Sequence, residues 1–165
     1  MTNQIILDHN QIQHIIKRIA YQIYETFVDD KKIILAGIKE NGFILATKIK
    51  EQLDQISTLE VELCEIIINK KKPIDEVKTS MAPSTYKNQA IVLVDDVLNT
   101  GSTLIYAVKH FLEHDIKKCK TAVLINRNHK MYPIKADFKG LSLSTSKNEH
   151  VQVEFKNNEN AAYLS

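Results

Sequence analysis

The hydrophobic positions of this chain repeat with two different periods, which predict helices alternating with strands. Isoleucines at positions 12, 15, 16, 19 and 23, followed by Phe27, recur with helical spacing. We therefore expect an opening helix along this stretch, with Asp8 or Asn10 capping its start. The short apolar runs at 33–36, 61–68, 90–94 and 121–125 are typical of strands that are buried on both faces.

Two further segments, 43–53 and 103–113, fit helices between these strands. Strands that alternate with helices predict an α/β fold with a central, mainly parallel sheet. We expect residues 37–42 to form a loop, residues 128–156 to form short extended pieces, and the polar residues from 157 onward to form a tail.

The 165 residues, 44% of them hydrophobic, fit a single domain with its own core. Within the domain, residues 1–165, we predict a core at about 28–127 and a small hood. The hood comes from the N-terminal helix region and residues 128–156. The polar segment 69–88, which contains the run Lys70-Lys71-Lys72 and two prolines, interrupts the core strands. A long polar loop at such a place is typical of a flexible lid over a site.

Composition excludes several classes of function. A net charge of +2 gives no general support for a nucleic-acid partner, although a local basic patch remains open. No apolar run approaches the length of a membrane span, so we expect no membrane partner. Cys64 and Cys119 are far apart, which favours free thiols in a reducing cytoplasm. His110 and His114 are spaced for one helix face, more typical of a solvated face than of a metal site.

The most informative segment follows the third apolar run. Two acids, Asp95 and Asp96, come directly after the strand, and the loop Leu98-Asn99-Thr100-Gly101-Ser102-Thr103 then opens a helix. A helix N-terminus presents free N–H groups to an anion, and glycine allows the backbone to approach it closely. The hydroxyl groups at 100, 102 and 103 add donors. These features together predict a phosphate cradle.

The two carboxylates beside this cradle suit the hydroxyls of a ribose, or a hydrated Mg²⁺ ion. The competing interpretation is an acidic strand end followed by an ordinary helix cap. Neither a Walker A loop nor a dinucleotide fingerprint fits the glycine spacing, so those classes of nucleotide site are excluded.

The run from Val94 to Thr103 resembles the phosphoribosyl pyrophosphate signature of type I phosphoribosyltransferases. That resemblance implies the family's fold, with a hood and a flexible lid, and Mg²⁺ as cofactor. It implies that Asp95 and Asp96 hold the ribose hydroxyls and, through water, the metal. It places Val97, Leu98, Asn99, Thr100, Gly101, Ser102 and Thr103 around the ribose and its 5′-phosphate. Residues Ile38, Lys39, Glu40, Asn41 and Gly42 resemble the family's pyrophosphate loop, and Lys70 and Arg127 complete the implied catalytic set.

The C-terminal part is similar to one subfamily, the bifunctional pyrimidine operon attenuator and uracil phosphoribosyltransferase. The similarity lies in Arg127 to Lys130, in Pro133 to Gly140 and in Thr145-Ser146-Lys147. It implies conversion of a nucleobase, with uracil as the leading substrate, to its nucleoside monophosphate by a homodimer or higher homo-oligomer. The chain departs from the pattern at Asn99, at Ser102 and at Lys71-Lys72. A nucleotide-sensing RNA-binding regulator and a purine-base phosphoribosyltransferase therefore stay open as alternatives.

Overall fold

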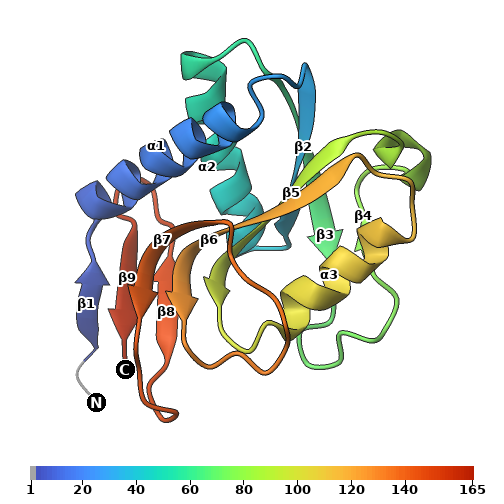
Figure 1. Ribbon diagram of the computed structural model, residues 1–165. Coiled ribbons are helices and arrows are strands. Elements are labelled where there is room, and N and C mark those ends of the chain that lie inside the picture. The colour runs from blue at the N-terminus through green and yellow to red at the C-terminus, as the bar shows by residue number, and fades with distance from the viewer. Residues whose placement is uncertain (1–2) are drawn as a thin grey trace.

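The computed structural model describes residues 3–165, so the first two residues of the predicted domain lie outside the described part. Helices cover both faces of a twisted sheet, and a second, smaller sheet stands beside it (Figure 1). In the described part no helix is long and apolar enough to cross a membrane.

The main sheet has six strands in the order β4-β3-β2-β5-β6-β7. Its members are β2 (Lys32–Ile38), β3 (Glu60–Ile67), β4 (Lys78–Thr79), β5 (Ala90–Leu98), β6 (Lys118–Arg127) and β7 (Phe138–Leu143). All neighbours pair in parallel except β4, which runs antiparallel to β3. The predicted α/β class with a mainly parallel sheet is confirmed.

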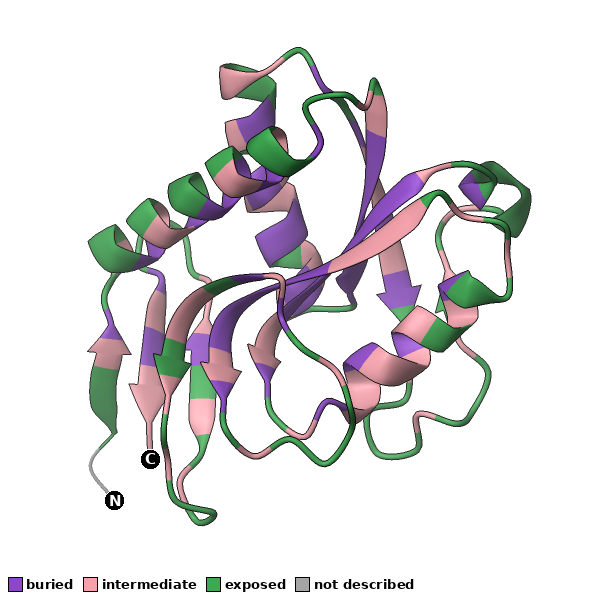
Figure 2. Ribbon diagram, viewed as in Figure 1, coloured by how far each residue is buried: buried purple, intermediate pink, exposed green. Residues whose placement is uncertain are grey.

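Each face of this sheet has its own hydrophobic core. Side chains alternate along β5, so that Val92 and Val94 join the cluster under α1 (His9–Thr26) and α2 (Asn41–Ile56). Ile91 and Leu93 join the cluster under α3 (Ser102–Leu112). The central strands β2, β5 and β6 are buried over most of their length, whereas the helices show buried and exposed stripes (Figure 2). The continuous apolar runs of the sequence therefore have the expected physical cause.

The opening helix begins where its capping residues predict. The Asp8 carboxylate accepts a hydrogen bond from the Gln11 backbone N–H, and the Gln11 side chain accepts one from the Asp8 N–H. Such a reciprocal capping box satisfies two donors that the first helical turn leaves free. Of the two candidates for the cap, Asp8 is the one used.

A second sheet, with strand order β1-β9-β8, lies beside the main sheet (Figure 1), and we call it the hood sheet. The hood expected from the N-terminal helix region and residues 128–156 stays a prediction. The hood sheet joins β1 (Gln4–Leu7) to β9 (Ala161–Leu164) and β9 to β8 (Val151–Glu154), all antiparallel. The prediction of a polar tail after residue 157 is wrong, because Ala162 of β9 is fully buried between its two neighbours. The opening strand β1 was not predicted at all.

Two predicted loops are shorter than expected. Gly37 and Ile38 belong to β2, and Asn41 already starts α2, so the loop at 37–42 contracts to Lys39 and Glu40. The segment 69–88 is irregular only over its first half. Its second half contains β4 and a 3₁₀ turn, Pro83–Tyr86, whose Tyr86 side chain is fully buried and hydrogen-bonds the Thr79 hydroxyl.

Candidate active site

The candidate site lies at the point where the order of strands in the sheet reverses, between β2 and β5. After β2 the chain crosses to β3 on one side, and it later returns to place β5 on the other side of β2. The carboxyl ends of β2 and β5 therefore lie next to each other with loops that diverge, an arrangement that opens a crevice in parallel sheets. The pyrophosphate-loop candidates follow β2, and the acid pair and cradle follow β5.

The two acids are consecutive residues near the carboxyl end of strand β5, so their side chains face opposite sides of the sheet. Asp95 follows the α3 side, is 4% exposed, and accepts a hydrogen bond from the Asp96 N–H at 2.9 Å. Asp96 follows the α2 side and is half-buried. Burial raises the pKa of Asp95 well above its usual value; Asp96 adds to the shift, and Lys70 counteracts it. The site thus holds carboxylates whose charge the protein alone leaves poorly compensated.

Asn41 connects three parts of the site. Its side-chain amide donates to Asp96 Oδ2 and to the carbonyl oxygen of Val153, each at 2.9 Å. It therefore ties the pyrophosphate-loop candidate to an acid on β5 and to hood strand β8. The preceding residue, Glu40, has a φ of 71°, which costs a non-glycine residue conformational energy. Strain of this kind at a turn is typical of functional loops.

The cradle encloses a small cavity of about 60 Å³ at the N-terminus of α3. Gly101 has a φ of 87°, in the left-handed region that favours glycine. A Cβ atom there would lie 2.3 Å from Ile134 Cγ2, so the loop also lacks room for one. The Thr100 hydroxyl accepts from the Ser102 N–H at 3.3 Å. The N–H groups of the first helical turn and the hydroxyl groups are hydrogen-bond donors, so this cavity suits an anion.

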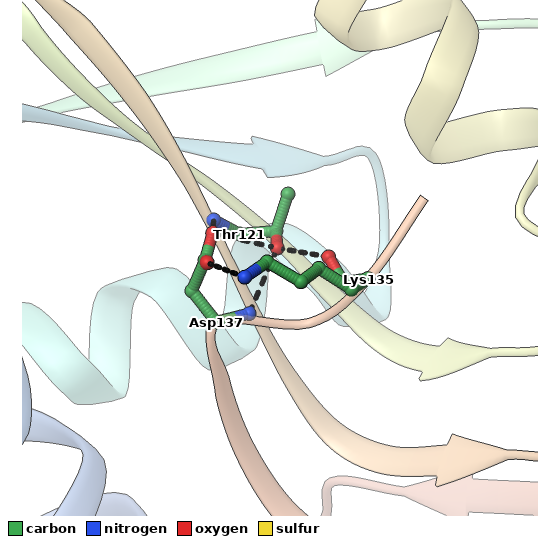
Figure 3. A network of polar contacts seen from close by, with 3 residues as sticks. All are labelled: Thr121, Lys135 and Asp137. Carbon is green, nitrogen blue, oxygen red and sulfur yellow. Dashed lines mark hydrogen bonds and ion pairs between the residues drawn. The ribbon is translucent and has the colours of Figure 1, made fainter. Parts of the chain in front are cut away.

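The segment between β6 and β7 supports the cradle from outside. The Thr100 carbonyl accepts from the N–H groups of Met131 and Tyr132 at 2.8 and 3.2 Å. Further along, Asp137 Oδ2 accepts from the Thr121 N–H at 3.0 Å, and the Thr121 hydroxyl donates to the Lys135 carbonyl at 2.5 Å (Figure 3). These contacts fix both parts of the segment, which gives the sequence motif around Asp137 a structural role.

Lys70 is the lysine of its run that lines a cavity together with the acid pair. That cavity, of about 330 Å³, is also lined by Asn99 and Thr100. Lys72 instead pairs with Asp75 at 3.3 Å. The N–H groups of Lys71 and Lys72 both donate to Asn69 Oδ1, which turns this part of the segment back on itself. Lys71 and Lys72 do not line the 330 Å³ cavity, but with Lys70 they line another of about 390 Å³ that also reaches Thr100 and Ser102.

A larger cavity of about 540 Å³ adjoins the cradle. It is lined by Asn99, Thr100, Arg127, His129, Lys130, Met131, Lys147, Glu149 and His150. Asn99, Thr100 and Arg127 also line the 330 Å³ cavity, so the two spaces share a boundary. A ligand that extends from the cradle past Asn99 would enter this larger space.

The acid pair could supply part of the ligand set of a magnesium ion. In the described residues, no group of three or more His, Cys, Asp and Glu side chains could hold a metal ion by itself. Asp95 and Asp96 nevertheless offer hard oxygen ligands beside a cavity large enough for a phosphorylated ligand. Mg²⁺ typically takes one or two carboxylates, several waters and substrate phosphates. The donor set fits that pattern.

The structure thus brings the acid pair, the cradle from Val97 to Thr103, the turn from Ile38 to Gly42, Lys70 and Arg127 to one edge of the sheet. Sequence reasoning missed the bridging role of the Asn41 side chain and the loop contacts of Arg127. Both depend on partners more than 15 residues away in the chain, at Val153 and Thr145. His110 and His114, expected to face solvent, instead lie half-buried with their rings against Tyr86.

Comparisons with known proteins agree with this geometry. Residues 2–158 match the family described as the phosphoribosyl transferase domain. The chain is 37% identical over 158 residues to the "Bifunctional protein PyrR" of Streptococcus thermophilus, covering 93% of this chain and 90% of that protein. It is 36% identical over 160 residues to the protein of the same name from Streptococcus pneumoniae, covering 93% and 91%.

Solved structures show the same fold. The hypoxanthine phosphoribosyltransferase of Trypanosoma cruzi superposes with a TM-score of 0.80 at 16% identity, covering 96% of this chain and 95% of that one. A hypoxanthine phosphoribosyltransferase from Staphylococcus aureus gives 0.74 at 17% identity, covering 87% and 79%. At such identities the likeness concerns the fold alone.

Proposed function

Since this chain belongs to the phosphoribosyl transferase domain family and is a phosphoribosyltransferase, we propose that it converts uracil to uridine monophosphate with phosphoribosyl pyrophosphate and Mg²⁺. The C1–O bond to pyrophosphate breaks, a bond from C1 to the base nitrogen forms, and the proton of that nitrogen is released. The observation that carries the proposal is the acid pair beside the cradle at the switch point of the sheet.

Each group has a role in this reaction. Thr100 to Thr103 bind the 5′-phosphate with backbone N–H and hydroxyl donors. Asp95 and Asp96 accept hydrogen bonds from the ribose hydroxyls and from metal-bound water, and Asn41 orients Asp96. Magnesium, when bound, offsets the charge that grows on the leaving pyrophosphate.

The cations complete the leaving-group side. Lys70, which lines a cavity with the acid pair, offers charge to the pyrophosphate. The turn at Lys39 and Glu40 borders the pyrophosphate in this proposal, although the Lys39 N–H already donates to the Ile66 carbonyl at 2.8 Å. Segment 69–77 acts as a lid that excludes water while the oxocarbenium-like centre forms. Hydrogen exchange in this segment should slow when phosphoribosyl pyrophosphate and Mg²⁺ are added.

Asn99 favours a pyrimidine over a purine. It lines both larger cavities and so faces the place where an acceptor base would lie. Purine enzymes of the family carry an acid at this position, whereas an amide cannot take up a proton as a general base. A purine base is therefore the less favoured acceptor.

One experiment tests the proposal directly. The protein is incubated with labelled phosphoribosyl pyrophosphate and Mg²⁺, with uracil, hypoxanthine, guanine or adenine, and nucleotide and pyrophosphate are measured. We expect uridine monophosphate in the uracil reaction and none without Mg²⁺. Nucleotide from hypoxanthine but not from uracil would contradict the substrate assignment, and no nucleotide from any base would contradict the activity.

The similarity of the C-terminal part to the pyrimidine operon attenuator subfamily favours a second candidate, a nucleotide-sensing RNA-binding regulator. Steeply salt-dependent RNA binding would support it. The face of α1 with His14, Lys17 and Arg18 offers little for this role, because the Arg18 guanidinium donates to the carbonyls of Lys139 and Gly140 at 3.1 Å. A homodimer and a cytoplasmic location remain proposals, the first testable by sedimentation.

A further inference from the structure

Segment 144–150 connects β7 to β8 and forms one wall of the 540 Å³ cavity, opposite the cradle. It contributes the side chains of Lys147, Glu149 and His150 to that cavity. The segment contains no helix or strand. Its backbone is held at its end, where His150 and Ser165 exchange two hydrogen bonds at 2.7 and 3.0 Å, and the shape of the rest depends mainly on side-chain contacts.

Arg127 supplies most of those contacts. It lies at the end of β6 and is only 4% exposed. Its Nε and Nη2 groups donate to the Thr145 hydroxyl at 3.0 and 2.8 Å, and Nη2 also donates to the Glu149 carbonyl at 2.7 Å. Burying a cation is costly unless hydrogen bonds replace its water. Here the replacing oxygens come from both ends of the same short segment, so the segment is pinned where the guanidinium lies.

Neighbouring contacts strengthen this clamp, which we define as Arg127 and Thr145. His129 Nε2 lies 3.1 Å from the Thr145 hydroxyl, and the Thr145 N–H donates to Asn128 Oδ1 at 3.3 Å. The Glu149 carboxylate accepts from the Ser146 N–H at 2.5 Å, which lowers the pKa of Glu149. This acid is therefore engaged within the segment itself, and Lys147 and His150 are the other side chains of the segment that line the cavity.

We propose that Arg127 is a positioning residue: through Thr145 it shapes segment 144–150 and so sets the affinity for the acceptor base, without setting the affinity for phosphoribosyl pyrophosphate. The inference rests on the proposed function, because it assigns the wall to the acceptor. The ammonium groups of Lys147 on this wall and of Lys130 in the same cavity suit a base that carries carbonyl oxygens, such as an oxo-pyrimidine. The implied catalytic role of Arg127 is replaced by this one.

The test compares two ligands that share the cradle. Uridine monophosphate would contact both the cradle and the wall, whereas ribose 5-phosphate would contact the cradle alone. Thr145→Val removes the hydroxyl that accepts from Arg127, keeps the branched shape, and changes no residue that lines the cavity. Calorimetry should show about tenfold weaker binding of uridine monophosphate and unchanged binding of ribose 5-phosphate. In the uracil reaction, KM for uracil should rise more than kcat falls.

Two matched variants control for other causes. Thr145→Ser keeps the hydroxyl and should restore the wild-type ratio of the two affinities. Thr26→Val removes a comparable hydroxyl, which bonds the Gln22 carbonyl at 2.9 Å near the end of α1, and should change neither affinity. If Thr145→Val fails to fold, Thr145→Ala provides the same comparison, because it removes the same hydroxyl and likewise changes no residue that lines the cavity.

Equal losses for both ligands, or no loss for uridine monophosphate, would overturn the clamp. A wild-type protein that binds the two ligands equally would overturn it too, since the wall would then add nothing. These outcomes are distinct from a failure of the proposed function. A protein that forms no nucleotide from any base, yet loses uridine monophosphate affinity on Thr145→Val, would keep the clamp and contradict the activity.

Discussion

A buried aspartate lies at each end of the parallel sheet, and the two differ in the charges around them and in the direction of their pKa shifts. At the amino ends, the Asp30 side chain is 5% exposed and pairs with Lys117 at 2.5 Å and Lys118 at 2.9 Å. At the carboxyl ends, Asp95 is 4% exposed and has Asp96 as its neighbour. Burial acts to raise the pKa of both carboxyls. The two lysines outweigh it and lower the pKa of Asp30, whereas Asp96 adds to it at Asp95.

This difference separates stability from function. The charge at Asp30 is compensated inside the protein, so it contributes to folding. Asp95 and Asp96 line a cavity, and in the function proposed here a ligand or cation compensates their charges. Loops diverge at the carboxyl ends of a parallel sheet and leave a crevice where ligands bind. Two adjacent carboxylates without a cationic partner are therefore expected at this end of the sheet. Substitutions at the two ends should therefore change different measurable quantities.

The largest effect is expected at the cradle. Gly101→Val forces a branched residue into a φ of 87° and places its Cβ against Ile134, so the loop must move. Affinity for phosphoribosyl pyrophosphate, measured by calorimetry, should fall by more than about a hundredfold. Adding Ile134→Ala should recover stability without recovering affinity, because the backbone strain remains. Unchanged affinity in the folded single variant would contradict the cradle assignment.

Asp95→Asn and Asp96→Asn test the acid pair itself. Each change removes a charge at nearly constant size, so Mg²⁺-dependent binding of phosphoribosyl pyrophosphate should weaken roughly tenfold to hundredfold. The melting temperature without ligand should stay the same or rise, because repulsion between two adjacent carboxylates is relieved. Lowered stability with intact affinity would instead support an acidic strand end with no role in binding.

Asp30→Asn is the matched change at the other end. It leaves two lysines without their partner, and it should cost about 1–2 kcal/mol of unfolding free energy, limited by the solvent exposure of those lysines. The lowered pKa means that the wild-type advantage is present above about pH 4 and is lost as pH falls through the folded pKa. Chemical denaturation near pH 7 and near pH 3 measures this, and ligand affinity should not change.

The smallest effect concerns His110, which is neither paired nor directed to the site. Its Nε2 atom is buried without a partner among the described residues, and burial lowers its pKa. Below about pH 6.5 the unfolded chain takes up a proton that the folded one resists, so stability falls as pH falls.

His110→Phe keeps a ring against Tyr86 and removes the titrating group. The variant should gain up to about 1 kcal/mol over the wild type at about pH 5.5 and show a flatter dependence of melting temperature on pH. His14→Phe, on the exposed face of α1, is the control and should not flatten it. A parallel shift of both variants would show that hydrophobicity, and not titration, is responsible.

Sequence reasoning worked where the pattern is local. The strand, the acids and the glycine of residues 91–103 lie within one stretch, so their period and spacing predict the strand–loop–helix unit that the structure shows. The anion site at this unit stays a prediction. The prediction placed the acids after the strand, although β5 continues to Leu98. Strand ends are set by pairing with neighbours, here with β6 as far as Asn126, and the sequence of one strand does not contain that information.

Nonlocal features could not be predicted. Strand β9 has four residues and depends on β1 and β8 for its hydrogen bonds, so no periodicity marks it. The partial burial of His110 and His114 depends on Tyr86, which arrives from a segment that reads as an open polar loop. The Arg127–Thr145 clamp likewise needs the end of β6 to meet segment 144–150.

The β1-β9-β8 sheet has a consequence for protein synthesis. Gln4 pairs with Leu164, so β1 has no partner strand until residues 161–164, which are synthesised much later, have left the ribosome. The six-stranded sheet has no such requirement, because its strands lie between residues 32 and 143. A growing chain can therefore assemble the cradle and acid pair well before Asn41 gains the Val153 carbonyl in a completed hood. Nascent chains should acquire affinity for the sugar phosphate earlier than for the base.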